Sequence, residues 1–424
     1  MVTTYPDLFR TFGRIGLLSF GGPAGQIALM HRVLVDEKRW LDEARYLHAL
    51  SFCMLLPGPE AMQLATYAGW TLKGWRGGLI AGLLFVLPGA LVITALTALF
   101  LAWGQVPLVA GLLFGLKAAV LAVVIEALLR VAKRALKGQA AFAIAIAAFA
   151  AIAFMKAPFP LVIAAAALAG ALFLDGGKAK DEALADSGGG WREALASTAV
   201  WGALWLLPLA ALLWFSGVPK VLADEALFFS KMAVVTFGGA YAVLAYVAQQ
   251  AVDVYGWLSP GEMLTGLGLA ETTPGPLILV LVFVGFLGGA RLSGWGEITG
   301  GLAGAGVTLW FTFVPCFLWV LAGAPFVERL RRVIWLTSAL AGVTAAVVGV
   351  IANLALWFGL HALFGSVGEA AFGPLTLPVP ELAMFDWRAG LIAAGAGVAL
   401  LRLRWNLFAV LGLAAAAGAA VARL

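Results

Sequence analysis

The chain has 424 residues, of which 63% are hydrophobic and only 12% are charged, and its formal net charge is +5. This apolar share far exceeds that of a soluble domain, so the composition excludes a soluble enzyme or binding module and predicts an all-α, multi-pass membrane protein. The positive charge fits basic cytoplasmic loops and gives no argument for nucleic acid. Both cysteines, Cys53 and Cys316, lie in apolar runs, so neither a disulfide nor a metal site is expected.

Broken helices are predicted near the start of the chain. A helix over residues 7–34 is interrupted at 20–23, where the sequence reads Phe-Gly-Gly-Pro. A helix from about Arg45 must end before Pro57, which has no N–H to donate, whereas Pro59 suits the first turn of a new helix. The helix before Pro57 and the helix after it each have about 12–14 residues, or roughly 18–21 Å, and are too short to cross a hydrocarbon core of about 30 Å.

Longer apolar spans follow these short helices, and the plan occurs twice. In the first half we predict spans over residues 77–103, 107–130, 140–157 and 158–174, and a connecting span over 194–215. In the second half we predict broken segments over 224–250 and 259–289, followed by spans over 297–323, 333–364, 387–401 and 405–421.

An internal repeat relates the two halves. The run Ser19-Phe20-Gly21-Gly22 matches Thr236-Phe237-Gly238-Gly239, and Pro57-Gly58-Pro59 matches Pro274-Gly275-Pro276, each pair lying 217 positions apart. Chance similarity would not keep one separation over roughly forty-five residues. The predicted organisation is an N-terminal repeat over 1–174, a linker with one transmembrane helix over 175–222, and a C-terminal repeat over 223–424.

The distribution of Lys and Arg predicts the orientation. Basic clusters at 130–137, 329–332 and 402–404 should be cytoplasmic. The loop 248–262 has no Lys or Arg, whereas its repeat partner 31–45 has four. Equivalent loops of opposite character indicate two repeats of inverted topology. Their broken segments are either re-entrant hairpins or discontinuous spanning helices.

The paired motifs carry a family resemblance. They read SFGGP from Ser19, LLPGPEAMQLATYAGW from Leu55, TFGGAY from Thr236 and LAETTPGPLILVLVFVGF from Leu269. These motifs resemble the chromate ion transporter family in its two-domain, long-chain form, over nearly the whole chain. The resemblance implies a secondary transporter that exports chromate across the bacterial inner membrane, driven by the membrane potential or a proton gradient, and so gives chromate resistance. It implies sulfate as a related substrate, no enzymatic activity and no cofactor.

The residues themselves suit a dianion. A tetrahedral oxyanion needs N–H donors and positive potential, which helix N-termini supply. The predicted substrate-binding residues are turn glycines, flanking hydroxyls and two repeat-equivalent cations, namely Arg14, Ser19, Gly21, Gly22, Gly58, Lys231, Thr236, Gly238, Gly239, Thr272, Thr273 and Gly275. The alternative is that the glycines only allow close helix packing and that the cations reach towards a membrane interface.

Two carboxylates are candidates for proton coupling. Glu60 lies in the first turn after one Pro-Gly-Pro motif, and Glu271 lies three residues before the other. Either could exchange a proton for substrate, or could instead be a helix cap or an ion-pair partner. Secondary polar candidates are Gln63, Lys117 and Glu126.

Other functions remain open at this point. A sulfate or other small-oxyanion transporter would use the same mechanism, and an anion channel would need a continuous lined pore. An intramembrane enzyme would need a catalytic cluster, but the sequence has three histidines and no HExxH motif. The sequence also leaves a homodimer open.

Overall fold

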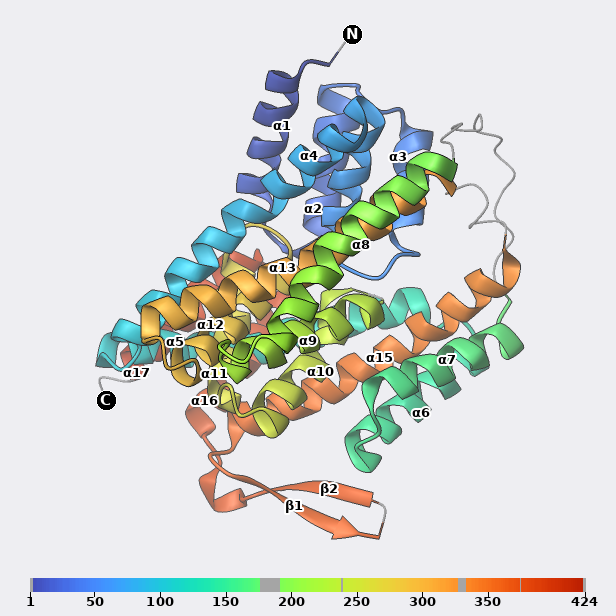
Figure 1. Cartoon of the computed structure of the whole chain (residues 1–424). Coiled ribbons are helices and arrows are strands. Elements are labelled where there is room, and N and C mark those ends of the chain that lie inside the picture. Colours follow the sequence, from blue (N-terminus) through green and yellow to red (C-terminus); the bar gives the residue numbers. More distant parts are fainter. Residues whose placement is uncertain (1–2, 176–190, 238, 327–332, 374, 422–424) are drawn as a thin grey trace. The chain divides into compact units, whose positions relative to one another are not determined.

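The computed structural model describes residues 3–175, 191–237, 239–326, 333–373 and 375–421 (Figure 1). The chain divides into two compact units, and each unit takes segments from both halves of the sequence. The first unit comprises Met1–Thr97, Gly177–Ala240 and Thr273–Leu336; the second comprises Ala98–Gly176, Tyr241–Thr272 and Thr337–Leu424. The predicted basic cluster at 329–332 and linker residues 176–190 lie outside the described residues.

Helices make up the described part of the first unit. In chain order they are α1 (Tyr5–Leu18), α2 (Gly22–His31), the π-helical turn η1 (Arg32–Glu37), α3 (Glu43–Cys53), α4 (Glu60–Trp103, which continues past Thr97), α8 (Trp191–Trp214), α9 (Lys220–Val235), the short 3₁₀ turn η3 (Leu277–Leu279), α12 (Val280–Leu292), α13 (Glu297–Gly323) and the 3₁₀ turn η4 (Ala324–Phe326). Helix α13 packs against α8, α9 and α12, as Figure 1 shows.

The helices break where proline and glycine predict it. Helix α1 ends at Leu18 and α2 begins at Gly22, with φ of 83° at Gly21 and 70° at Gly22. Helix α3 ends at Cys53, ahead of Pro57, and α4 begins at Glu60. Residues with a side chain rarely adopt positive φ values such as those of Gly21 and Gly22.

The first 13 residues of α4 form a short arm. Gly74 is not helical, with φ of 60° and ψ of −157°, and the chain turns back there. A methyl group on Gly69 would lie 2.3 Å from the carbonyl oxygen of Gly77, so the two arms touch backbone to backbone. The second repeat makes a similar contact, because a methyl group on Gly289 would lie 2.2 Å from the carbonyl oxygen of Gly300. Small residues permit such close approach between membrane helices.

The repeat also extends to backbone hydrogen bonds. The π-helical turn η1 has its counterpart in η2 (Gln250–Val254). The N–H of Trp40 donates to the Leu34 carbonyl oxygen over 2.8 Å, and 217 positions later the N–H of Trp257 donates to the Ala251 carbonyl oxygen over the same distance. The two halves therefore share local structure at the same separation as their motifs.

The second unit contains the remaining elements. They are α5 (Pro107–Ala135), α6 (Gln139–Met155), α7 (Phe159–Phe173), α10 (Ala240–Gln249), η2, α11 (Pro260–Thr272), α15 (Ile334–Leu363), β1 (Val367–Phe372), β2 (Leu375–Pro380), the 3₁₀ turn η5 (Leu382–Met384), α16 (Trp387–Gly397), the π-helical turn η6 (Val398–Arg402) and α17 (Leu407–Val421). Helix α5 packs against α11, α16 and α17. Its Gly115 meets α17 so closely that a methyl group there would lie 1.9 Å from the Ala414 carbonyl oxygen.

The hairpin β1–β2 is a feature that the sequence did not predict. Its antiparallel register runs from Val367 opposite Pro380 to Phe372 opposite Leu375. Both strands of a two-stranded sheet are edge strands, so the prolines of β2 are tolerated. The expectation of an all-α architecture otherwise holds among the described residues.

Several of the described helices are long enough to span a membrane. Five of them are long and apolar enough to cross a bilayer, namely Glu60–Trp103, Pro107–Ala135, Trp191–Trp214, Glu297–Phe326 and Trp335–Leu363. Shorter apolar helices cover Gln139–Met155, Phe159–Phe173, Leu277–Leu292 and Leu407–Val421. The chain is a multi-pass α-helical membrane protein, as its composition predicts.

Candidate functional site

The two Pro-Gly-Pro motifs meet the other repeat inside the first unit. We call Pro57-Gly58-Pro59 the N-terminal tip and Pro274-Gly275-Pro276 the C-terminal tip. The N–H of Gly58 donates to the Thr236 carbonyl oxygen over 2.7 Å, and the N–H of Gly275 donates to the Ser19 carbonyl oxygen over 2.8 Å. Donors and acceptors are both repeat equivalents, 217 positions apart. The bonds form a reciprocal pair, which we call the tip crossing.

Both tip glycines are required by conformation and by space. Their φ values are 125° at Gly58 and 90° at Gly275, where a side chain causes strain. A Cβ at Gly58 would lie 2.8 Å from both Cys316 Sγ and Gln63 Nε2, and one at Gly275 would lie 2.9 Å from Leu279 Cδ1. The absence of a side chain therefore allows the close approach of the two repeats.

One glutamine supports each tip. Gln26 Nε2 donates to the Gly275 carbonyl oxygen over 2.6 Å, and Gln63 Nε2 donates to the Pro57 carbonyl oxygen over 2.7 Å. A carbonyl oxygen can only accept, so these bonds fix the orientation of both amides. The Oε1 atoms of both glutamines are buried and have no hydrogen-bond partner among the described residues. Two unused acceptors therefore lie beside the crossing.

Gln63 is a predicted polar contact, but Gln26 was missed by the sequence reasoning. The residue 217 positions after Gln26 is Val243, so comparison of the two repeats gives no signal for it. Gln26 lies on α2, one turn after the Gly-Gly-Pro break, and a polar side chain next to a helix break could have identified it as a candidate.

The hydroxyls and N–H groups predicted to bind substrate are partly occupied. Ser19 Oγ donates to the Ile15 carbonyl oxygen over 2.6 Å, and Thr236 Oγ1 donates to that of Met232 over 2.5 Å. With the N–H groups of Gly58 and Gly275 also bonded, the crossing is closed in this conformation.

Open space lies instead at the glycine turns. A Cβ at Gly21, Gly22 or Gly239 would meet no atom within 4 Å. In the described part of the chain, the N–H groups of Gly21 and Gly22 make no backbone hydrogen bond. Successive N–H groups at a helix start form a concavity suited to an anion. Gly238 lies outside the described residues.

The two predicted cations do not lie in the buried crossing. Arg14 is exposed, and its Nη1 is 3.4 Å from Glu37 Oε2. Lys231 is also exposed. Arg14 comes five residues before the buried Ser19, and Lys231 comes five residues before the buried Thr236. The cations therefore flank the crossing from an accessible surface.

The remaining candidates are divided between the two units. Glu60 begins α4 directly after the N-terminal tip, and Thr273 is buried beside the C-terminal tip in sequence. In the second unit, Tyr241 O–H donates to Glu271 Oε1 over 2.5 Å, and Thr272 Oγ1 donates to the Leu269 carbonyl oxygen over 2.8 Å. Glu271 is thus a buried carboxyl group with a phenol partner.

The two secondary candidates on α5 lie in different local settings. Glu126 forms an ion pair with Arg130 one turn later on the same helix, with 3.1 Å between Oε1 and Nε. Lys117 Nζ would lie 3.4 Å from a methyl group on Gly261 of α11. Neither contact is specific for an anion.

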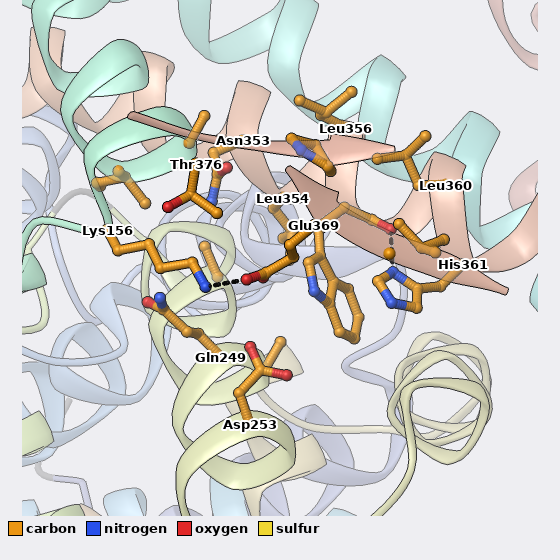
Figure 2. A pocket seen from close by; sticks show the side chains of 18 residues that line it. Lys156, Gln249, Asp253, Asn353, Leu354, Leu356, Leu360, His361, Glu369 and Thr376 are labelled. Atoms are coloured by element: carbon orange, nitrogen blue, oxygen red, sulfur yellow. Dashed lines mark hydrogen bonds and ion pairs between the residues drawn. The ribbon is translucent and has the colours of Figure 1, made fainter. Parts of the chain in front are cut away.

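A separate polar cavity of about 180 Å³ lies in the second unit (Figure 2). Its polar lining includes Lys156, Gln249, Asp253, Asn353, His361, Glu369 and Thr376. Lys156 Nζ and Glu369 Oε2 are 2.5 Å apart, so the lysine charge is already paired. Burial raises the pKa of the Asp253 carboxyl above its ordinary value, and the nearby His361 and Lys156 act in the opposite direction. With two carboxylates and a paired lysine, this cavity does not suit a dianion.

Broken helices that meet inside a multi-pass helical protein are the architecture of a membrane transporter. Among the described residues, no group of three or more His, Cys, Asp or Glu side chains could hold a metal ion. The chain belongs to the chromate transporter family, whose sequence model matches residues 6–171 and 224–419, one stretch in each half. This is a family of transporters and not of enzymes.

Three relatives illustrate the similarity. The chain is 35% identical over 356 residues to the chromate transport protein of Pseudomonas aeruginosa, covering 82% of this chain and 79% of the relative. It is 28% identical to the probable chromate transport protein of Synechococcus elongatus, with 84% of this chain and 85% of the relative covered. It is 27% identical to the chromate transport protein of Cupriavidus metallidurans, with 82% and 81% covered. No solved structure gives a significant match.

Proposed function

We propose that this protein is a secondary transporter that exports chromate across the bacterial inner membrane and thereby gives chromate resistance. The tip crossing carries the proposal, because it joins two repeats through paired, equivalent bonds inside one unit. Such an arrangement lets one repeat move against the other around a fixed site. The names of the relatives in Pseudomonas aeruginosa and Cupriavidus metallidurans support chromate as the substrate.

Chromate binds at the glycine turns beside the crossing. At the start of α2, the N–H groups of Gly21 and Gly22 make no backbone hydrogen bond to a described residue, and a Cβ at Gly21, Gly22 or the equivalent turn residue Gly239 would meet no atom within 4 Å. Lys231 and Arg14, on accessible flanks, raise the local concentration of the dianion by electrostatic attraction, with Glu37 offsetting part of the Arg14 charge.

The tips act as the moving element. When the crossing opens, the N–H groups of Gly58 and Gly275 are released and can donate to substrate oxygens. The Ser19 and Thr236 segments that accepted these bonds separate at the same time. The Gly58 and Gly275 donors thus become available only in the conformation in which the crossing is open.

The second unit supports an inverted arrangement of the repeats. Its cavity brings together Lys156 after α6, Asp253 from η2, and the hairpin between α15 and α16. One span separates Lys156 from the basic cluster 130–137, so this side of the unit faces away from the cytoplasm if that cluster faces it. The region 248–262, which has no Lys or Arg, then lies on the side away from the cytoplasm, as inverted topology predicts for it.

Transport into everted inner-membrane vesicles tests the proposal. Radiolabelled chromate should enter vesicles that contain the protein, saturate with concentration, and fall to background when a protonophore collapses the proton gradient. Unlabelled sulfate should compete if the site accepts any tetrahedral dianion. Vesicles without the protein are the control. Uptake at background level would refute chromate transport, and non-saturating uptake that ignores the protonophore would indicate a channel.

A further inference from the structure

An unpartnered carboxyl group is buried in the first unit, away from the tips in sequence. Glu225 on α9 has 0% exposure, and neither of its carboxyl oxygens has a hydrogen-bond partner among the described residues. A methyl group on Gly304 of α13 would lie 3.1 Å from Glu225 Oε2, so the carboxyl group packs against α13 where that helix has no side chain. An ionised carboxylate in this place would be very costly, because nothing there replaces its water.

Two hydroxyls on α13 are also unpartnered. Thr308 and Thr312 lie one and two helical turns after Gly304, and both Oγ1 atoms are buried without a hydrogen-bond partner in the described chain. A threonine in a helix often donates to the carbonyl one turn earlier, as Thr97 does to Ile93. Thr308 Oγ1 instead faces α12, where a methyl group on Gly285 would lie 2.0 Å from it.

Packing does not require a carboxyl group at position 225. The residue 217 positions earlier is Leu8, on the equivalent helix α1, and it is also fully buried. The scaffold therefore accepts an apolar side chain at the equivalent place. The Glu225 carboxyl group, by contrast, makes no hydrogen bond to any described residue.

We propose that Glu225 is the proton-carrying group of the transport cycle, buried in a part of the first unit where Thr308 and Thr312 on α13 also lack side-chain partners. The proposal rests on the proposed function and assigns its coupling site. In the described conformation the carboxyl group holds its proton. When the first unit opens to water on one side, the O–H bond breaks, the proton passes to water, and the water that enters solvates the carboxylate. A proton from the opposite side restores the starting state.

The charged groups around Glu225 leave this assignment intact. Asp224, next on α9, repels a negative charge on Glu225 and lies 3.9 Å from Lys220 Nζ through its Oδ2. The neighbouring helices carry charged residues at exposed end positions, namely Arg192 and Glu193 on α8, Arg291 on α12 and Glu297 on α13. The thiol of Cys316, also on α13, donates to the Thr312 carbonyl oxygen over 3.1 Å. On α9 itself, Lys231 is exposed.

Glu225→Gln in the full chain, reconstituted in liposomes, tests the proposal. The variant should lose chromate accumulation driven by an imposed pH gradient by at least about tenfold. Exchange of labelled for unlabelled chromate at equal pH should persist, because exchange needs no net proton movement. In infrared spectra, the wild type should show a protonated-carboxyl band that titrates with pH and that Glu225→Gln removes. Unchanged accumulation with an unchanged pH profile would overturn the proposal.

Matched variants separate coupling from folding. Asp224→Asn, which changes the neighbouring carboxylate, should accumulate chromate like the wild type. Glu225→Leu, which copies Leu8, should behave like Glu225→Gln. Accumulation by the wild type that follows a Na⁺ gradient at fixed pH would overturn the proton assignment. If the wild type carries no chromate, the proposed function fails and the assignment of Glu225 to its transport cycle fails with it. If the wild type carries chromate but shows no protonated-carboxyl band, the coupling assignment alone is refuted.

Discussion

Replacing Gly58 by alanine should strongly reduce the rate of transport, because the added methyl group perturbs the N-terminal tip in two ways. The new Cβ would lie 2.8 Å from both Cys316 Sγ and Gln63 Nε2, and the backbone φ is 125°. Backbone strain costs about 1–3 kcal/mol, and losing the bond from Gln63 to the Pro57 carbonyl costs about 1 kcal/mol. The sum of about 2–4 kcal/mol lowers the population of the observed tip by roughly 30-fold to 1,000-fold at about 1.4 kcal/mol per factor of ten.

The assay is initial chromate uptake by everted vesicles at equal abundance of each variant. Gly58→Ala should lose at least about tenfold of the wild-type rate, and Gly58→Val should lose more. Gly296→Ala is the matched control, because Gly296 also has a positive φ, of 87°, but a Cβ there meets no atom within 4 Å, and Gly296 lies outside the proposed binding site. Its smaller loss should reflect conformation alone. Adding Cys316→Ala to Gly58→Ala removes one of the two contacts and should restore part of the rate.

The reasoning fails if Gly58→Ala transports chromate like the wild type. It also fails if Gly58→Ala and Gly296→Ala lose the same amount of activity, because the contacts with Cys316 and Gln63 would then have no effect.

Three further predictions concern the groups around the crossing. Gln63→Leu removes the hydrogen bond to the Pro57 carbonyl, at about 1 kcal/mol, and should slow uptake severalfold without lowering abundance; an unchanged rate would remove this bond from the mechanism. Arg14→Ala and Lys231→Ala should each slow uptake, most strongly at low ionic strength, because salt screens the attraction that they provide; identical salt dependence in variants and wild type would exclude that role. Glu271→Gln should flatten the pH dependence of uptake if this carboxyl group contributes to coupling, and an unchanged profile would leave coupling to other groups.

Much of the helical plan follows from local rules in the sequence. Pro57 and the glycines of the turn at 20–23 end helices through their own covalent geometry, so the breaks were predictable without knowledge of any partner. The longer spans follow from hydropathy and length alone. The constant separation of 217 positions could be read directly from the repeated motifs.

Contacts between the repeats could not be predicted in this way. Each tip pairs with the Ser19 or Thr236 segment of the other repeat, which depends on tertiary packing and not on any local preference. Gln26 and Glu225 are missing from the predicted site because their repeat equivalents, Val243 and Leu8, are apolar. Site prediction from symmetry favours residues that occur twice, whereas these two residues break the symmetry.

The hairpin β1–β2 was missed for a different reason. Its second strand reads Leu-Thr-Leu-Pro-Val-Pro, and prolines argue against a strand inside a larger sheet. The alternation of apolar side chains in that strand was the available signal.

The reciprocity of the tip crossing has an energetic consequence. Because its two hydrogen bonds are nearly equal in length and join equivalent groups, a conformation that opens only one and its mirror counterpart should differ little in free energy. The bias between facing inward and facing outward would then come from the places where the halves differ, such as Gln63 against Val280. In a carrier with two conformations of nearly equal free energy, a small contribution from the binding of each transported ion is enough to shift the equilibrium between them.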